Sequence, residues 1–327
     1  MEISLPLILL STVVIMAMPL SFGVKGNQLS YNYYKNSCPN LESLVERELM
    51  SVFMTDIRAP SAFLRLMFHD CQVQGCDASI LLDTIYATQS SEIASSGNFA
   101  IRNRETINDI KSVLEEECPG QVSCADIIVL AAKVSVSLSG GPSIQVPFGR
   151  KDSRTSSSKE ADAKLPSPTV TVDEFLSIFK SKGMNIQESV AILGAHTLGV
   201  GHCLSIVGRL YNQNQQIGNN MNLGYETSLR LACPTVIPMT NLTFVPNDMT
   251  PTIFDNQYYR DIMMGRGLLG IDSSISRDPR TAPIVMRFAM DQSYFFENFS
   301  SAFVKLSASN VLTNIQGEVR RKCNQLN

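Results

Sequence analysis

The sequence of 327 residues contains no tryptophan and only three histidines, so few imidazole side chains are available for catalysis or metal binding. It has no long basic run and a net charge of −3, which argues against nucleic acid as the main partner. Eight cysteines are present but no CxxC pair, which argues against a zinc site. Apolar residues make up 44% of the chain, enough for a large core in one domain or two.

The only long apolar run lies at the N-terminus, over residues 5–20. It is short for a membrane span, and no lysine or arginine precedes it. We favour a cleaved signal peptide over a retained anchor. The small residues Ser21 and Gly23 fit the positions before a cleavage site, and cuts after Gly26 or Asn27 are alternatives.

An even number of cysteines behind a secretion signal predicts disulfides, although the spacing alone does not select the pairs. Cys71 and Cys76 are near enough in sequence to be natural partners. Two glycosylation sequons, at Asn241 and Asn298, agree with secretion but carry little weight individually.

Helical patterns dominate the chain and strand signals are few. Capping boxes at Thr171–Glu174 and Asn185–Glu188 predict helix starts, and Gly199 and Gly201 predict the end of the second of these helices. The polar stretch 153–168 is typical of a surface loop. We expect helices over 41–53, from Pro60 through Phe68, over 105–117, 123–138 and 172–182, and from Asp278–Pro279, with short strands over 143–148 and 267–271.

The segment from Phe68 to Asp77 carries the strongest chemical signal. His69 follows Arg65 by four residues, so both lie on one face of a helix. A cation and a proton acceptor directed into one pocket can polarise and split a small polar bond. His196 is surrounded by small residues that allow a flat, bulky group to approach. A lone histidine in an apolar helix is more often a core residue, so the neighbours of these histidines decide the interpretation.

Six motifs together resemble the secreted haem peroxidases of plants, the class III family. They occur in the family's order over roughly residues 28 to 325, and their combination is specific although each alone is not. The motifs are Arg65–Cys71, Gly75–Leu82, Val122–Asp126, Gly141–Pro142 with Gly149–Ser153, Leu193–Gly199 and Phe254–Tyr259. The resemblance implies an all-α, two-lobed fold with haem between the lobes and a few short strands. Residues 1–27 are then the signal peptide and 28–327 one haem peroxidase domain.

The resemblance also implies the catalytic roles. His196 is expected to be the axial ligand of haem b, with Asp272 accepting its other ring proton. On the opposite haem face, His69 is expected to take a proton from hydrogen peroxide and return it to the leaving oxygen. Arg65 stabilises the negative charge that develops, and Asn98 fixes the tautomer of His69.

Further positions match the family around the haem. Phe68 is expected to wall the peroxide pocket, Pro166 to lie at the opening for phenolic donors, and Arg58 to bind a haem propionate. Three features depart from the family pattern. His202 stands where a glutamine near a propionate is common, Ile144 stands where a tryptophan is common, and 102–105 replaces the usual run after the distal asparagine. None of these changes removes a catalytic group.

Two calcium sites follow from the same resemblance. The second contains a departure, since the family's aspartate position holds Asn247 while Asp248 lies one residue later, so either is open as a ligand. Oxygen donors suit a hard cation such as calcium. The first site is expected to use Asp70, Val73, Gly75, Asp77, Ser79 and Glu92, and the second Thr197, Asp248, Thr250, Ile253 and Asp255.

The family's disulfide pairs are Cys38–Cys118, Cys71–Cys76, Cys124–Cys323 and Cys203–Cys233. The expected activity is reduction of hydrogen peroxide with oxidation of phenolic donors such as wall phenolics. The expected form is a monomer in the cell wall or apoplast, free of the membrane after signal cleavage. The vacuole is less favoured because the chain ends four residues after Cys323. The alternatives are a haem-containing wall-binding protein with little turnover and a pure haem carrier. The retained set of Arg65, His69, Asn98, His196 and Asp272 argues against both.

Overall fold

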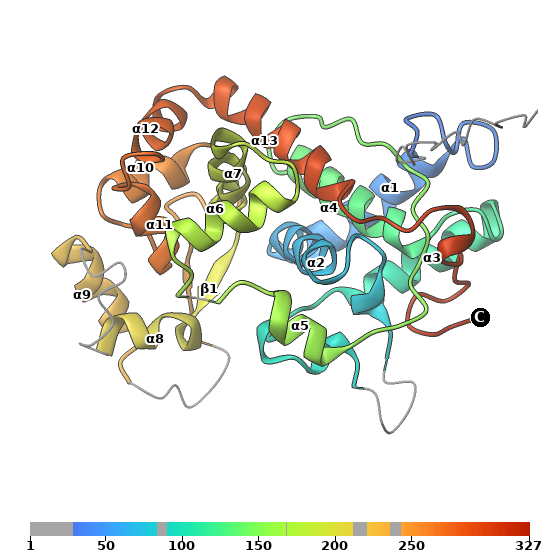
Figure 1. The fold of residues 1–327 in the computed structure, drawn as a ribbon, viewed down its shortest axis with the longest axis horizontal. Coiled ribbons are helices and arrows are strands. Elements are labelled where there is room, and N and C mark those ends of the chain that lie inside the picture. The colour runs from blue at the N-terminus through green and yellow to red at the C-terminus, as the bar shows by residue number, and fades with distance from the viewer. Residues whose placement is uncertain (1–28, 84–89, 168, 212–220, 236–242) are drawn as a thin grey trace, which may run out of the picture.

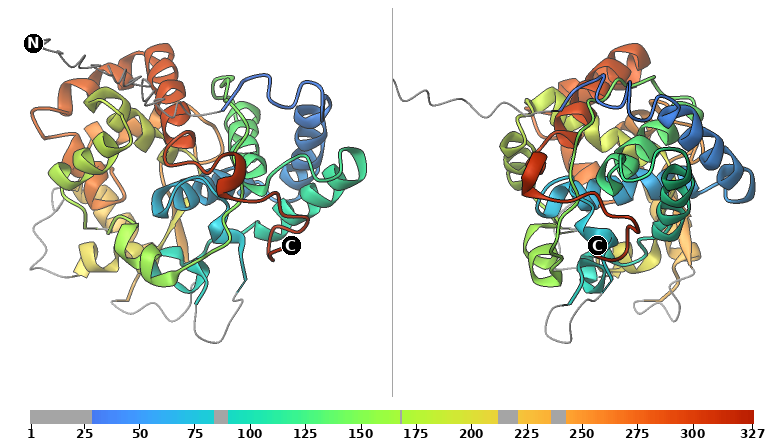
Figure 2. Two further views of the ribbon diagram at one scale, coloured as in Figure 1. Left: turned by 45° about the vertical axis from the view of Figure 1, so that its right-hand side comes forward. Right: turned by 90° about the vertical axis from the view of Figure 1, so that its right-hand side faces the viewer.

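The structure is a computed structural model that describes residues 29–83, 90–167, 169–211, 221–235 and 243–327. The expected signal peptide and the sequon Asn241 lie outside these residues. Helices make up most of the fold, and Figures 1 and 2 show them in two groups joined through the middle of the molecule. The mostly α-helical architecture confirms the fold class that the sequence predicts. No helix of the described residues is long and apolar enough to cross a membrane.

The N-terminal group is built around two central helices, α2 (Ala59–Val73) and α4 (Cys124–Leu138), which pack on each other. Ser123 caps α4 by accepting a hydrogen bond from the amide of Asp126. Helix α4 is buried nearly all round, as its continuous apolar sequence predicts. The other elements of this group are α1 (Leu41–Thr55), the 3₁₀ turns η1 (Ser79–Leu81), η2 (Glu92–Ala94) and η3 (Ser96–Asn98), α3 (Arg104–Glu117) and α5 (Ser158–Lys164).

The C-terminal group starts with two helices whose capping boxes are both present, as predicted. They are α6 (Val172–Ser181) and α7 (Ile186–Ile192). The remaining elements are η4 (Leu193–Thr197), β1 (Val200–His202), α8 (Cys203–Tyr211), α9 (Leu223–Ala232), β2 (Phe244–Pro246), α10 (Gln257–Met263), α11 (Gly270–Ile275), α12 (Ala282–Met290), α13 (Gln292–Ser307) and η5 (Asn314–Gln316). Strands β1 and β2 pair antiparallel, with Gly201 opposite Val245.

Two hydrophobic clusters hold these elements together. The larger one joins α1 to α4 with α6, α7, α10, α12 and α13. The smaller one lies under α8, α9 and β2, where the Cys203–Cys233 disulfide is buried with Ile206, Leu229 and Val245. Helix α13 packs on both α7 and α2, so it crosses between the two groups (Figure 1).

Both strand predictions are wrong. In residues 143–148, Ile144 and Val146 are buried, but among the described residues the segment forms a single bridge, between Phe148 and Ser30. Pro147 lacks the N–H that a ladder needs, which favours an unpaired segment. Residues 267–271 run into α11, because the Asp272 carboxylate accepts a hydrogen bond from the Leu269 amide and starts a helix there.

Three boundary predictions also need correction. The stretch 153–168 is not all loop, since Ser157 caps the short helix α5. The helix expected at Asp278 begins four residues later, at Ala282, because the Asp278 side chain closes a turn on the Arg280 amide instead. Helix α7 ends at Ile192, before both predicted glycines, and the chain continues as the 3₁₀ turn η4 through Thr197.

Candidate active site

Helix α2 carries Arg65, Phe68 and His69, and Asn98 reaches His69 from η3. His69 Nδ1 lies 2.7 Å from the side-chain oxygen of Asn98. The Asn98 amide nitrogen donates to the Glu92 carbonyl at 2.7 Å, which fixes the orientation of the amide group. An amide oxygen can only accept, so Nδ1 of His69 carries the proton and Nε2 is the basic nitrogen.

The environment keeps His69 neutral. Burial lowers the pKa of His69 to about 3, with the positive charge of Arg65 acting in the same direction and the Asn98 hydrogen bond opposing both. Burial also lowers the pKa of Arg65 to about 10, so Arg65 remains a cation at neutral pH. Its guanidinium lies 3.4 Å from the Gly97 carbonyl. The pair thus combines a neutral base with a fixed positive charge.

His196 lies in η4, and its Nδ1 is 3.0 Å from an Asp272 carboxylate oxygen. Asp272 also accepts hydrogen bonds from the Tyr258 hydroxyl at 2.9 Å and the Leu269 amide at 2.8 Å. Burial lowers the pKa of His196, but the charge and hydrogen bond of Asp272 outweigh it and raise that pKa. With Nδ1 directed at Asp272, Nε2 of His196 is the nitrogen that fits haem iron.

The oxygens expected at the first calcium site include several buried atoms without a partner. Among the described residues, Asp70 Oδ1, Ser79 Oγ and both Glu92 carboxylate oxygens accept or donate no hydrogen bond. Burial raises the pKa of Glu92 to about 8 and that of Asp77 to about 6, with the hydrogen bond from the Ser79 amide and the charge of Arg320 opposing the shift at Asp77. Buried, unpaired oxygen atoms of this kind fit a hard cation.

The oxygens expected at the second calcium site also lie together. The Thr197 hydroxyl lies 2.7 Å from Asp248 and 3.1 Å from Asp255, and the Thr250 hydroxyl lies 3.1 Å from Asp255. The Ile253 carbonyl is 3.5 Å from the same Thr197 hydroxyl. Asn247 turns away, because its amide donates to the Leu198 carbonyl. Asp248 is therefore the residue of that pair that joins the cluster.

In the described part of the chain, no group of three or more His, Cys, Asp or Glu side chains forms a metal cluster. Each expected calcium set instead combines a few carboxylates with hydroxyl or carbonyl oxygens. Such mixed oxygen sets are ordinary for calcium.

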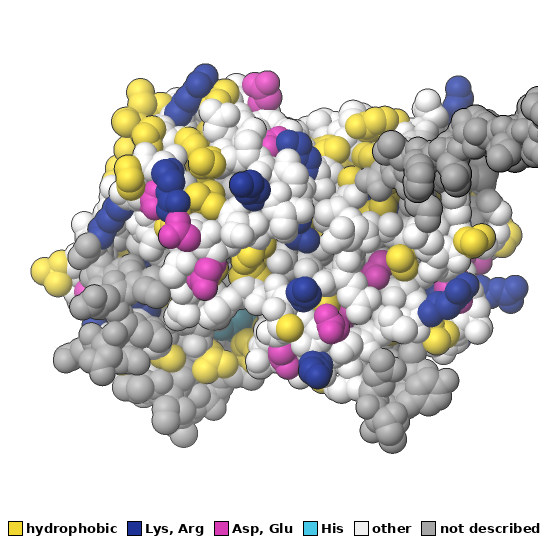
Figure 3. Space-filling view, in the orientation of Figure 1, with side chains coloured by type: hydrophobic (Ala, Val, Ile, Leu, Met, Phe, Trp, Pro, Cys, Tyr) yellow, Lys and Arg dark blue, Asp and Glu magenta, His cyan; other side chains and the backbone are white. Residues whose placement is uncertain are grey.

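The structure also gives the surroundings of Phe68, Arg58 and Pro166. The Phe68 ring packs edge-on to His69, with centroids 5.7 Å apart. Arg58 stacks on Phe244, with 4.7 Å from its guanidinium carbon to the ring centroid. Pro166 is half-buried and follows Leu165, which lies against Gly97. Figure 3 shows a histidine surface in a recess between the part of the molecule that carries α8 and the part that carries α5.

The comparisons with known proteins agree on one family. The family model described as Peroxidase matches residues 45–291. Peroxidase 29 of Arabidopsis thaliana is 53% identical over 302 residues, which cover 91% of this chain and 89% of the relative. Peroxidase 21 of the same plant is 38% identical, over 94% of this chain and 93% of the relative. Peroxidase 12 is 41% identical, over 93% of this chain and 84% of the relative.

The chain belongs to the plant haem peroxidases. It is a peroxidase enzyme, and the family implies haem as cofactor with hydrogen peroxide and a reducing donor as substrates. This peroxidase has four disulfides among its described residues, which are the pairs that the resemblance implies: Cys38–Cys118, Cys71–Cys76, Cys124–Cys323 and Cys203–Cys233.

Sequence reasoning missed two contacts of this peroxidase. The Tyr258 hydroxyl donates a hydrogen bond to Asp272. The Phe254–Tyr259 motif contains Tyr258 but does not indicate this contact. The His202 ring lies between Phe99 and Phe244, with ring centroids 5.5 Å and 6.5 Å away. Phe99 directly follows η3 and Phe244 lies in β2, both far from His202 in sequence, so local patterns do not reveal these contacts. The sequon Asn298 lies within α13, where its amide donates to the Tyr294 carbonyl.

Proposed function

We propose that this peroxidase is secreted and reduces hydrogen peroxide to water while it oxidises phenolic donors in one-electron steps. The observation that carries the proposal is the bond between His69 Nδ1 and the Asn98 oxygen. It leaves Nε2 of a neutral imidazole free to accept a proton. A structural core histidine would need no neighbouring cation, whereas Arg65 stands one helical turn away.

His196 and Asp272 are the residues that would hold haem b. The half-exposed His196 ring, with Nδ1 bonded to a buried carboxylate, suits iron ligation through Nε2. When bound, the haem supplies two-electron reduction of the peroxide bond and one-electron oxidation of donors. Arg58 is the residue proposed to bind a propionate, and both Arg58 and His202 contact the Phe244 ring.

The protein residues move one proton and stabilise one charge. Nε2 of His69 takes a proton from one oxygen of hydrogen peroxide and passes it to the other oxygen, which departs as water. Arg65 stabilises the negative charge on that oxygen while the O–O bond breaks. Each peroxide then requires two phenol molecules, and each phenol gives one electron and one proton to complete the second water. Phe68 walls this pocket, and Pro166 marks the proposed donor opening.

Asp272 makes the proposed iron ligand more electron-donating. A carboxylate that accepts the Nδ1 proton gives the imidazole partial anionic character, which favours oxidised states of the metal. Burial disfavours the ionised form of Asp272, but its interactions with His196, Leu269 and Tyr258 keep its pKa below the usual value. The carboxylate is therefore ionised at working pH.

Two calcium ions are proposed for the two oxygen clusters, with Asp248 rather than Asn247 in the second. The phenolic donors that we favour are wall phenolics and lignin-type monomers, and the proposed location is the cell wall or apoplast rather than the vacuole. We propose a monomer.

One experiment separates the enzyme from the two alternatives. The mature protein is purified, its Soret band and haem content are measured, and guaiacol oxidation with hydrogen peroxide is followed. The proposal predicts one haem per chain and rapid turnover. A normal haem spectrum without turnover would instead favour a wall-binding protein or a haem carrier.

A further inference from the structure

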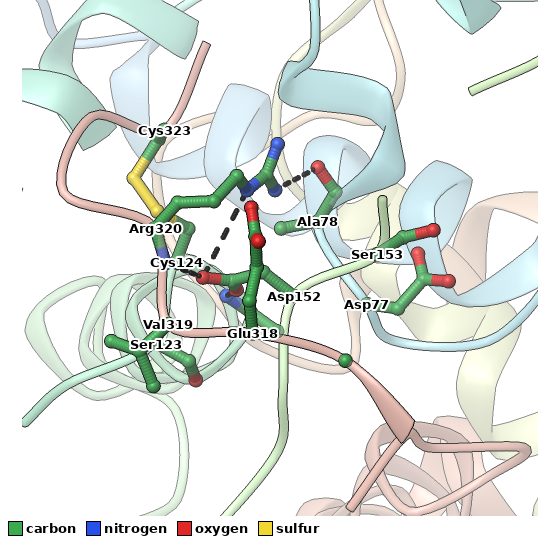
Figure 4. Close-up of polar contacts among 12 residues, drawn as sticks. Asp77, Ala78, Ser123, Cys124, Asp152, Ser153, Glu318, Val319, Arg320 and Cys323 are labelled. Atoms are coloured by element: carbon green, nitrogen blue, oxygen red, sulfur yellow. Dashed lines mark hydrogen bonds and ion pairs between the residues drawn. A yellow bond between two sulfur atoms is a disulfide. The ribbon is translucent and has the colours of Figure 1, made fainter. Parts of the chain in front are cut away.

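Arg320 is a completely buried arginine near the C-terminus. In the described part of the chain, the polar partners of its side chain are Ala78 and Asp152, neither of which belongs to the proposed catalytic set. Figure 4 shows its guanidinium between Asp152 and the backbone of Ala78. The side chain donates to the Ala78 carbonyl at 2.6 Å, while its Nε lies 3.9 Å from an Asp152 oxygen, beyond hydrogen-bond range. A buried charge requires a function or a strong compensating environment.

Asp152 is the residue that holds the Arg320 segment in place. Its carboxylate accepts hydrogen bonds from the Ala125 amide, in the first turn of α4, and from the Arg320 amide, both at 2.9 Å. Its backbone pairs with Glu318 through two further hydrogen bonds of 2.8 and 3.0 Å. The Cys124–Cys323 disulfide fastens the same segment to α4 (Figure 4). The position of Arg320 is therefore strongly determined.

The loop that Arg320 contacts has an unusual conformation. Ala78 adopts a left-handed φ of 58°, which a residue with a Cβ rarely takes. Its amide donates to Asp70 Oδ2 at 3.0 Å, and its carbonyl accepts from Arg320. The neighbouring Asp77 carbonyl accepts from the Ser153 amide at 2.7 Å. Hydrogen bonds from both sides thus compensate for the strain at Ala78.

We infer that Arg320, held by Asp152, is a positioning residue for the loop 74–82, and through it for the proposed first calcium site. The inference rests on the proposed function only for the calcium itself. Asp77 lies in this loop, whereas Asp70 lies in α2 and accepts the Ala78 amide with its Oδ2. Ala78 is the point where Arg320 holds the loop. Asp70 directly follows His69 in α2, so the hydrogen bond from the Ala78 amide to Asp70 connects the loop to the residue beside the proposed base.

An arginine suits this position better than a lysine. Its planar group carries donors in fixed directions, so it can bond the Ala78 carbonyl while its charge stays near Asp152 and Asp77. Among the described residues, Nε and Nη1 make no hydrogen bond, so the role of Arg320 depends on one directed bond and on its charge. A lysine would keep the charge but lose the direction.

The chain offers a matched control in Arg150. It is equally buried, is paired with the buried Asp126 at 2.7 Å, and bonds the Ser307 and Pro147 carbonyls. None of these partners belongs to the loop 74–82. Arg150→Lys therefore disturbs a buried arginine of the same kind elsewhere in the core.

The test compares Arg320→Lys with Arg150→Lys and the wild type. Amide hydrogen exchange is measured on peptides covering 74–82 in chelator-treated, haem-loaded protein, and the calcium content is measured before chelation. We expect exchange in 74–82 to rise about tenfold or more in Arg320→Lys alone, the scale of a lost bond from a charged donor. We also expect that variant to lose one calcium per chain and keep the other.

Equal exchange in 74–82 for both variants, or unchanged exchange in Arg320→Lys, would overturn the inference. Should Arg320→Lys fail to fold, Asp152→Asn is measured in the same way, because it removes the anion that holds Arg320. Wild-type protein without a first-site calcium would refute the calcium proposal. The exchange comparison would still decide the positioning role in that case.

Discussion

The Asn98 side chain bonds His69 through its oxygen and the Glu92 carbonyl through its nitrogen, and each hydrogen bond is 2.7 Å long. One amide group thus fixes the tautomer of the proposed base and joins it to the segment of the proposed first calcium site. Three buried residues, from α2, η2 and η3, are connected by two hydrogen bonds. The predictions about pH dependence and about calcium removal both depend on this connection.

The pH dependence follows from the lowered pKa of His69. A base must be neutral to accept a proton, and burial with the Arg65 charge lowers this pKa from about 6.5 to about 3. The rate constant for reaction with peroxide should therefore stay level from neutral pH down to about pH 4 and fall near pH 3. Stopped-flow measurements across this range check it. A decline centred near pH 6.5 would show that the imidazole is not protected in this way.

Calcium removal should slow the reaction with peroxide. Loss of the cation leaves Asp70 Oδ1 and both Glu92 carboxylate oxygens buried without a partner, so the Glu92 segment relaxes and its bond to Asn98 weakens. Rates and thermal unfolding are compared before and after chelator treatment, with metal content measured on each sample. An unchanged rate in protein that has verifiably lost both ions would contradict the connection through Asn98.

Asp248 and Asn247 differ in a testable way at the second site. Asp248→Asn removes an anionic oxygen from the cluster and should weaken calcium binding there by about tenfold or more. Asn247→Ala is the matched control, because that amide bonds the Leu198 carbonyl outside the cluster. Calcium titration with metal analysis distinguishes them. Greater loss of calcium from Asn247→Ala would reverse the assignment.

The Tyr258 hydroxyl should tune the proposed iron ligand. Tyr258→Phe removes one hydrogen bond to Asp272, so the carboxylate attracts the His196 proton more strongly and the Fe(III)/Fe(II) potential should fall. Asp272→Asn should move the potential in the opposite direction, because the anion is lost. Tyr259→Phe is the control, since this equally buried hydroxyl bonds the Val190 and Ala191 carbonyls. Equal shifts for both tyrosine variants would rule out a specific role for Tyr258.

The sequence predicts the fold class and the helices from α1 to α7 apart from α5, because caps and apolar periodicity are local signals. The caps at Thr171 and Asn185 are examples. It fails at 143–148, where alternating burial arises without a partner strand, and at 267–271, where one hydrogen bond to Asp272 starts a helix. Such outcomes depend on tertiary contacts that no local pattern contains.

The candidate site shows the same division. The candidate catalytic residues stand in recognisable motifs, so the family resemblance predicts them without coordinates. The choice between Asn247 and Asp248, the support from Tyr258 and the contact between Arg320 and Ala78 all require the folded chain. Arg320 lies more than two hundred residues from the loop it contacts, so only the closed fold brings them together.

The most direct test of the account is the reaction of haem-loaded protein with hydrogen peroxide, measured by stopped flow in the wild type and His69→Ala. We expect an unchanged resting haem spectrum in the variant and a reaction slower by about 10²–10⁴-fold, the usual contribution of a positioned acid–base group. His202→Gln, which removes the other histidine not proposed to bind iron, should react at nearly the wild-type rate. A His69→Ala variant that reacts as fast as the wild type would contradict the central claim.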